Sequence, residues 1–293
     1  MATQPLRSGP ARGPIWQMDF NAVPLRDEQN RRVWELLVCD PTGQFRQAQY
    51  CSNQEVNSTW VARQLRSYLE AAPQPPSAIR VFRARMSSIL QRACDAVGIP
   101  MLPSRRVYTL KAWMRERAEQ VYPQETQFTY SPEPPVDPDP PDPIRLPDKL
   151  QGERWAFVTL RAEDLQEAEA WPIAFGELFP VAWDTLTPDP FASGVRSTLI
   201  PGLVIISQRA LPMAAWMSGM EPAYLTVADG RLLFEAGLND CYLFTQLRDE
   251  KLRTEAEVFA QRQQQAQGIH FLAIQTDLEA QSFAGFWLMQ HPL

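Results

Sequence analysis

Apolar and polar positions alternate with a short period near the start of the chain. The segments IWQMDF (15–20), RVWELLVC (32–39) and FRQAQYCS (45–52) are short and rich in β-branched and aromatic residues. Polar residues separate the first two segments, and the turn sequence DPTG (40–43) precedes the third. This pattern predicts three sequential strands that pair antiparallel.

The apolar period then changes to that of a helix. After Ser58, a good helix N-cap, apolar residues recur three and four positions apart, which predicts a first helix. We expect a short strand at AIRVF (78–82) and a helix at SSILQRACDAVG (87–98) that ends at its glycine. RRVYTL (105–110) predicts a fifth strand, and 110–122 a last helix with an apolar stripe. The order β-β-β-α-β-α-β-α is that of a ribonuclease H-like fold.

The C-terminal half shows a second α+β pattern. YLTVADGRLLFEAG (224–237) predicts a β-hairpin, because Asp229 and Gly230 tolerate the positive φ that a tight turn requires. We also expect strands at 152–160, 199–207, 240–247, 268–274 and 285–291, and helices at 162–170, 208–220 and 254–266.

A proline-rich segment separates the two halves. Residues 123 to 149 contain nine prolines, each of which removes an amide donor and restricts the residue before it, so we expect an extended linker. The predicted organisation is α+β with two domains. The expected parts are a disordered leader at 1–14, a basic N-terminal α+β domain at 15–122, an acidic linker at 123–150 and an acidic C-terminal α+β domain at 151–293.

Charge is divided unevenly between these parts. Residues 1–123 hold 17 Lys and Arg against 10 Asp and Glu, whereas residues 124–293 hold 11 against 24. The excess is concentrated in 57–118, with 11 basic and 3 acidic residues, which indicates a polyanionic partner for the N-terminal domain. We find no apolar run long enough to span a membrane and no secretory signal pattern, and we expect a cytoplasmic protein.

The basic region has the composition of a single-stranded RNA-binding surface. Its arginines can pair with phosphates, and aromatic residues are interleaved with them, although helical spacing favours core positions for Trp113 and Tyr68. The candidate phosphate contacts are Arg80, Arg83, Arg85, Arg105, Arg106, Lys111 and Arg115. The interleaved aromatic residues are Trp60, Tyr68, Phe82, Tyr108, Trp113 and Tyr122. Alternatively, the arginines face solvent, the acidic second domain or an acidic protein partner.

Catalytic patterns are weak. Asp19, Asp40 and Glu70 are the residue types of a two-metal nuclease, but Asp40 lies in a turn that aspartate commonly caps, and Glu70 lies near a helix end on a polar face. The four cysteines are far apart, and only two histidines could join them as metal ligands. We find no phosphate-binding loop and no nucleophile elbow. The sequence therefore predicts a protein that is not an enzyme and needs no cofactor or metal.

Ten motifs in order along the chain resemble those of the Tab/Atab family of cyanobacterial and chloroplast RNA-binding proteins. They include W-x-x-D-F (16–20), W-E-L-x-V-C-D (34–40), F-R-x-x-M (82–86), P-S-R-R (103–106) and S-x-R-A-x-P-x-A-A-W-M-x-G (207–219). Further matches are W-x-x-E-R-x-x-x-V-Y (113–122), G-E-x-W-A-F-V (152–158), L-I-P-G-L (199–203), G-x-H-F-L-A-I-Q-x-D-L (268–278) and G-F-W-L (285–288).

The resemblance implies binding of A/U-rich single-stranded RNA. Its expected target is the 5′ leader of messages for photosystem reaction-centre subunits, photosystem I among them, and its expected role is to promote their translation and photosystem assembly. The translation machinery is a further expected partner. A non-catalytic scaffold that docks on an acidic translation or assembly factor remains the alternative.

Overall fold

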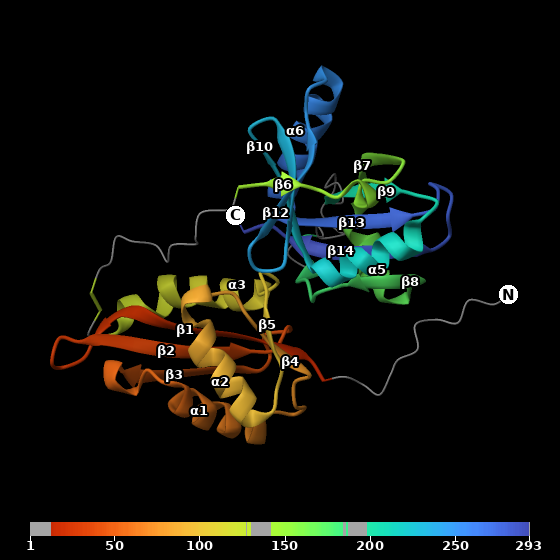
Figure 1. The fold of residues 1–293 in the computed structure, drawn as a ribbon. Coiled ribbons are helices and arrows are strands. Elements are labelled where there is room, and N and C mark those ends of the chain that lie inside the picture. The colour runs from red at the N-terminus through yellow and green to blue at the C-terminus, as the bar shows by residue number, and fades with distance from the viewer. Residues whose placement is uncertain (1–12, 127, 130–141, 184–185, 187–197, 293) are drawn as a thin grey trace, which may run out of the picture. The chain divides into compact units, whose positions relative to one another are not determined.

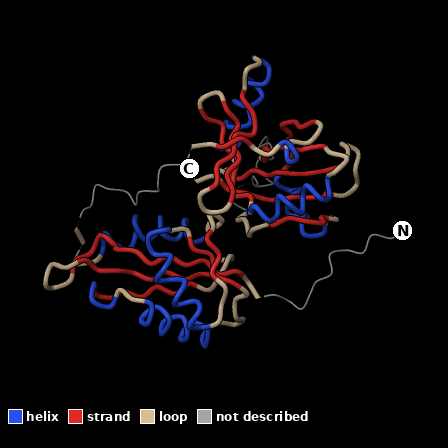
Figure 2. The backbone as a smooth tube through the Cα atoms, viewed as in Figure 1, coloured by secondary structure: helices blue, strands red, loops and turns tan. Residues whose placement is uncertain are grey.

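A computed structural model describes residues 13–126, 128–129, 142–183, 186 and 198–292. The described residues divide into two compact units, the first within 13–129 and the second within 142–292 (Figure 1). Both units combine helices and strands, as the tube drawing in Figure 2 makes clear. The α+β fold class expected from the sequence is therefore confirmed.

The first unit contains one five-stranded mixed sheet with the order β3-β2-β1-β4-β5. The central strand β1 pairs antiparallel with β2 and parallel with β4. At the edges, β3 pairs antiparallel with β2, and β5 pairs parallel with β4. The three sequential antiparallel strands agree with the prediction, whereas the element order alone left the placement of β4 and β5 open. The strands are β1 (Ile15–Arg26), β2 (Arg32–Cys39), β3 (Arg46–Ser52), β4 (Ala78–Val81) and β5 (Met101–Pro103).

Helices cover both faces of this sheet because side chains alternate along its strands. Trp16, Met18 and Phe20 of β1 lie in the core beneath α1 (Ser58–Ala71) and α2 (Ser87–Val97). The opposite face lies against α3 (Tyr108–Glu116), which continues as a wide helical turn, Arg117–Val121 (Figure 1). On that side the Leu110 N–H donates to Gln17 Oε1 at 2.9 Å. On this face of the sheet, α3 therefore contacts polar side chains of the central strand.

Two local predictions for this unit require correction. The cap of α1 is Asn57, whose side chain accepts a hydrogen bond from the Trp60 N–H at 2.9 Å, and Ser58 is the first helical residue. The fifth strand is Met101–Pro103, and of the predicted strand 105–110 only residues 105–107 precede α3, whereas 108–110 form its first turn. The alternation in RRVYTL over so few residues is compatible with either period, and the apolar spacing of Val107, Leu110 and Trp113 is that of a helix.

The second unit contains two sheets, with orders β7-β9-β13-β14-β8 and β10-β11-β12-β6. The first sheet consists of β7 (Arg154–Arg161), β9 (Leu199–Ile206), β13 (Ile269–Gln275), β14 (Phe283–Gln290) and β8 (Ile173–Glu177). The second consists of β10 (Pro222–Ala228), β11 (Arg231–Ala236), β12 (Asp240–Gln246) and β6 (Ile144–Arg145). Asp229 and Gly230 both adopt positive φ between β10 and β11, which confirms the predicted hairpin.

Two apolar cores lie on opposite faces of the five-stranded sheet. One core joins this sheet to the smaller sheet, to α5 (Ala210–Met220) and to α6 (Glu250–Gln265). The other lies beneath α4 (Ala162–Gln166), where Leu165 contacts apolar residues of the same sheet. Burial on both faces explains why β13 is apolar almost throughout and shows no clean alternation.

Parts of the predicted linker pack against the compact units. Phe128 forms an antiparallel bridge with Leu25 of the first unit. Ile144–Arg145 pairs with β12 of the second unit, and Leu146 and Leu150 are buried in its core. Residues 130–141 of the predicted linker and residues 1–12 of the predicted leader lie outside the described residues, so the predicted domain limits stay a prediction.

Candidate nucleic-acid interface

A buried ion pair joins β1 to the end of β4. Asp19 points toward the α3 side of the sheet, and the parallel register of β1 with β4 brings Arg83 to it. Arg83 Nε donates to Asp19 Oδ1 at 2.7 Å, with the two side chains only 15% and 4% exposed. Burial raises the pKa of Asp19, and the guanidinium of Arg83 opposes that shift. The pair therefore fixes the guanidinium at the end of β4.

A second buried polar cluster lies on the same side of the sheet. Arg117 Nε donates to Glu35 Oε2 at 3.1 Å, its Nη2 bonds the other carboxylate oxygen, and the Tyr122 hydroxyl donates to Glu35 at 2.5 Å. Arg117 also donates to the Tyr50 hydroxyl at 3.0 Å. Burial raises the pKa of Glu35, opposed first by the Tyr122 hydrogen bond and then by Arg117. This cluster ties the end of α3 to β2 and β3, which is a structural role.

The seven predicted phosphate contacts occupy different environments. Arg80 and Arg106 are buried, with 7% and 1% of their surfaces exposed, and the guanidinium carbon of Arg106 lies 5.5 Å from the Tyr108 ring centroid. Arg105 and Lys111 are half-buried. Arg85 and Arg115 are exposed. Sequence alone does not distinguish the buried from the exposed arginines. Arg80, for example, lies in a strand too short for the alternation of apolar and polar residues to show which face it occupies.

Three of these cations gather around the end of β4, and two more lie close to them in the chain. The guanidinium carbon of Arg83 lies 4.8 Å from the centroid of the Phe82 ring, and Lys111 Nζ lies 5.3 Å from the same centroid. The Ser104 N–H donates to Val81 O at 2.9 Å, which places the following Arg105 beside the same strand end. Arg85 follows Arg83 closely in the chain, and Arg115 is one helical turn beyond Lys111. We call this set, Arg83, Arg85, Arg105, Lys111 and Arg115, the basic patch.

The aromatic residues of this region belong to the core. All six that the sequence places among the basic residues are at most 9% exposed: Trp60 6%, Tyr68 6%, Phe82 9%, Tyr108 9%, Trp113 6% and Tyr122 7%. Helical spacing correctly favoured the core for Trp113 and Tyr68. A base cannot stack on rings that are this deeply buried, so none of these six residues offers an accessible aromatic face.

The three candidate nuclease carboxylates do not converge. Asp19 faces α3, whereas Glu70 is an exposed residue of α1 on the other side of the sheet. Asp40 caps its turn, accepting from the Phe45 N–H at 3.1 Å and from the Thr42 hydroxyl at 2.6 Å. Within the described part of the chain, no group of three His, Cys, Asp or Glu side chains could hold a metal ion. The arrangement therefore lacks the clustered carboxylates of a two-metal site.

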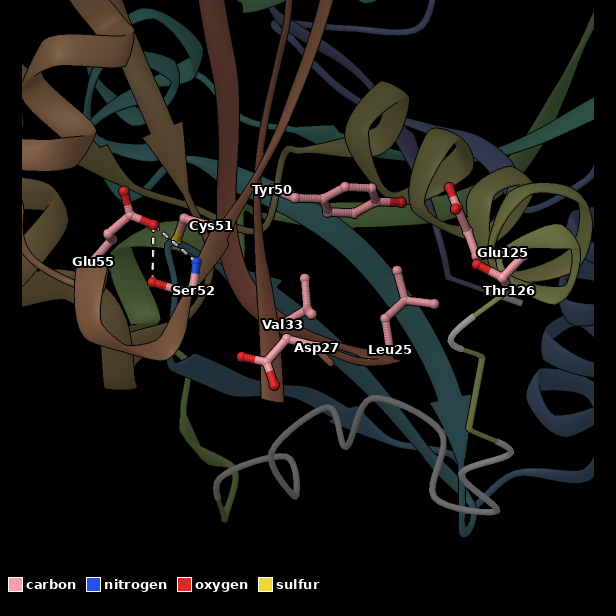
Figure 3. Close-up of a pocket in the computed structure, with 9 residues that line it drawn as sticks. All are labelled: Leu25, Asp27, Val33, Tyr50, Cys51, Ser52, Glu55, Glu125 and Thr126. Atoms are coloured by element: carbon pink, nitrogen blue, oxygen red, sulfur yellow. Dashed lines mark hydrogen bonds between the residues drawn. The ribbon is translucent and has the colours of Figure 1, made fainter. Parts of the chain in front are cut away.

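An open pocket of about 360 Å³ lies elsewhere in the first unit (Figure 3). Asp27, Glu55 and Glu125 contribute to its lining. The Ser52 backbone N–H donates to Glu55 and holds the pKa of that carboxyl below its ordinary value, and the Arg31 backbone N–H does the same for Asp27. Both carboxyls are therefore ionised at neutral pH, and the pocket is unsuited to phosphate.

The fold and its charges define a class of protein: a two-unit α+β protein whose first unit presents a basic patch beside a buried polar layer. None of its described helices is long and apolar enough to cross a membrane. Residues 15–117 match the family model for the N terminus of the RNA-binding protein Tab2/Atab2, and residues 133–290 match that for its C-terminal domain. The chain belongs to the Tab2/Atab2 family of RNA-binding proteins.

Two plant proteins are similar over nearly the whole chain. The chloroplastic protein TAB2 homolog of Zea mays is 35% identical, over 94% of this chain and 70% of its own length. The chloroplastic TAB2 homolog of Arabidopsis thaliana is 34% identical, over 94% of this chain and 74% of its own. Among solved structures, a chain of a simian T-cell lymphotropic virus intasome complex aligns over 84% of both chains with a TM-score of 0.31 and 12% identity, too low to establish a common fold.

Proposed function

We propose that this protein binds single-stranded A/U-rich RNA through the basic patch. The target that family membership suggests is the 5′ leader of messages for photosystem reaction-centre subunits. The protein would promote translation of these messages and assembly of the photosystem. We propose that it acts in the cytoplasm of a cyanobacterium-like cell. The observation that carries the proposal is the gathering of Arg83, Arg105 and Lys111 around the end of β4, with Arg85 and Arg115 close to them in the chain.

The patch suits phosphates because its nearest buried carboxylate is already compensated. Asp19 is held by Arg83, so it does not repel an incoming phosphate as an isolated carboxylate would. The same pair restricts the Arg83 guanidinium, so less side-chain freedom is lost when a phosphate binds. Arg85 and Arg115 are the most accessible members, and we assign them the largest share of the phosphate binding.

Arg80 and Arg106 have a different proposed role. Because both side chains are buried, direct contact with RNA bound at the surface would be costly. We therefore propose that they stabilise the patch through contacts inside the unit. The six core aromatic residues support it in the same way. Because the candidate nuclease carboxylates are far apart or engaged, we also propose that the protein leaves bound RNA intact.

A test uses two double variants that change the charge equally. Arg85→Ala with Arg115→Ala removes two exposed cations of the patch, whereas Arg63→Ala with Arg92→Ala removes two exposed cations of α1 and α2 on the other face. Removing one phosphate-binding cation should flatten the dependence of log K on log salt by about 0.7, so the slope of the patch variant should be shallower by about 1.4. The control should retain nearly the wild-type slope. Fluorescence anisotropy with an unstructured A/U-rich RNA 20-mer measures the binding constant of each double variant at several salt concentrations.

The same measurement separates RNA binding from the scaffold alternative. If the wild-type protein did not bind the 20-mer at physiological salt, or if both double variants bound like wild type, the patch would not be an RNA surface. A protein partner with an acidic surface would then be the better interpretation of the five cations.

A further inference from the structure

Trp216 is the most exposed aromatic side chain in the described part of the chain. It lies on α5 of the second unit with 53% of its surface exposed. The helix buries Ala210, Met213, Ala214 and Met217 against the sheet, which leaves Trp216 on the outward face. Tryptophan is enriched among the residues that contribute most to binding, so this exposed indole is a candidate contact residue.

The surroundings of Trp216 are open and carry a cation. Lys149 Nζ lies 6.0 Å from the centroid of the indole ring. Gly219, less than one turn along the helix, has open space where a Cβ would lie. The helix Ala210–Met220 contains no acidic residue, although residues 151–293 together hold 18 Asp and Glu against 9 Lys and Arg. In the described part of the acidic second unit, α5 therefore presents an aromatic face with a positive neighbour.

We propose that Trp216 stacks an unpaired base of the bound RNA while Lys149 holds an adjacent phosphate. This inference rests on the proposed function and assigns its base-stacking contact to the second unit. An indole and an ammonium together supply the two interactions that single-stranded RNA offers at each nucleotide, a π face and a phosphate. The first unit supplies cations, but its aromatic residues in the basic region are buried.

The exposed cation–π contact does not obstruct this site. An exposed contact of this kind is weaker than a base–aromatic stack, and the lysine stem rotates freely, so the ammonium can leave the ring for the phosphate. An apolar protein surface would fit less well, because it would cover the Lys149 ammonium without compensating its charge. The phosphate keeps this charge paired while the base covers the indole.

The central experiment compares Trp216→Ala with Leu211→Ala. Leu211 is 56% exposed on the same helix, so it is a matched control that removes apolar surface but no ring. Loss of one base stack should weaken binding of the A/U-rich 20-mer by about 5- to 150-fold, whereas Leu211→Ala should bind like wild type. Trp216→Phe should recover most of the loss because it keeps an aromatic face. Both side chains are exposed, so thermal unfolding should be unchanged in all three variants.

Salt dependence separates the two residues. Trp216→Ala removes no charge and should leave the slope of log K against log salt unaltered, whereas Lys149→Gln should flatten it by about 0.7. Lys251→Gln is the charge-matched control, since Lys251 lies on α6 and is 86% exposed. Photocrosslinking of a 20-mer containing 5-bromouridine should yield an RNA-linked peptide that contains Trp216.

Three results would overturn the inference. If Trp216→Ala binds the 20-mer like wild type while the Arg85 and Arg115 variant binds more weakly, the stacking site is wrong and the proposed function stands. Equal losses in Trp216→Ala and Leu211→Ala would indicate an apolar docking surface. If Trp216→Ala converts a dimer to a monomer in sedimentation velocity with no effect on RNA affinity, this face joins two copies of the chain.

Discussion

Replacing Arg83 by alanine should destabilise the first unit far more than the loss of a surface arginine. Asp19 Oδ1 accepts its hydrogen bond at 2.7 Å, and the carboxylate side chain is only 4% exposed, so the variant leaves a buried charge without compensation. Removing one partner of a buried pair costs about 3–5 kcal/mol, whereas an exposed pair contributes about 0–1 kcal/mol. The structure places this pair close to the first case.

The destabilisation should depend on pH in a defined direction. Without Arg83, burial is still opposed by the Phe20 backbone hydrogen bond but no longer by a guanidinium, so the pKa of Asp19 rises further above the value in the unfolded chain. The folded variant then binds more protons than the unfolded one in the interval between these two pKa values, so its stability falls as pH rises through that interval. We therefore expect Arg83→Ala to be more destabilised at pH 8 than at pH 5.

Hydrogen exchange during urea unfolding can measure this effect in the full chain. Peptides from β1 and β4 report on the first unit, and peptides from β13 serve as an internal control in the second. Adding Asp19→Asn to Arg83→Ala removes the uncompensated charge and should restore part of the lost stability. A cost below about 1 kcal/mol at pH 8, or no rescue by Asp19→Asn, would show that the pair behaves as an exposed one.

Three further predictions concern other parts of the fold. His270→Leu should cost about 1–3 kcal/mol in urea unfolding, because the buried Leu225 N–H loses its acceptor, His270 Nε2 at 2.8 Å; an unchanged midpoint would refute this role. Gly202→Ala should lower the melting temperature, because its Cβ would lie 2.3 Å from the Phe271 ring, and overpacking costs about 1–3 kcal/mol. Burial raises the pKa of Cys39 to about 12, so iodoacetamide at pH 8 should modify it only after unfolding; rapid labelling of the native protein, detected by mass spectrometry, would contradict the burial.

The spacing of apolar residues was sufficient to predict most helices and strands, and it failed for the shortest ones. The periods of 2 and 3.6 residues predicted the central strands of the first unit, both its longer helices and the hairpin at Asp229 and Gly230. The pattern misplaced the fifth strand, because β5 has three residues and its position depends on pairing with β4. A segment of that length carries too little periodicity to be read without its partner strand.

The candidate site shows a similar division. Net charge identified the basic half, and helical spacing correctly favoured the core for Trp113 and Tyr68. Neither could show that Arg83 is held by Asp19, because the two residues are 64 positions apart and meet only through the parallel pairing of β1 with β4. Trp216 also escaped notice, since α5 is apolar on nearly all sides and its pattern does not mark an exposed face.

The sequence by itself determined the α+β class, the family, the separation of charge along the chain and the helical and strand periods, because each depends on neighbouring residues or on simple counts. Tertiary structure alone decided which arginines are buried, which carboxylate compensates Arg83, and which aromatic ring faces solvent. These properties depend on contacts between elements that are distant in sequence. Long-range strand pairing sets those contacts, and the local period of the chain does not encode them.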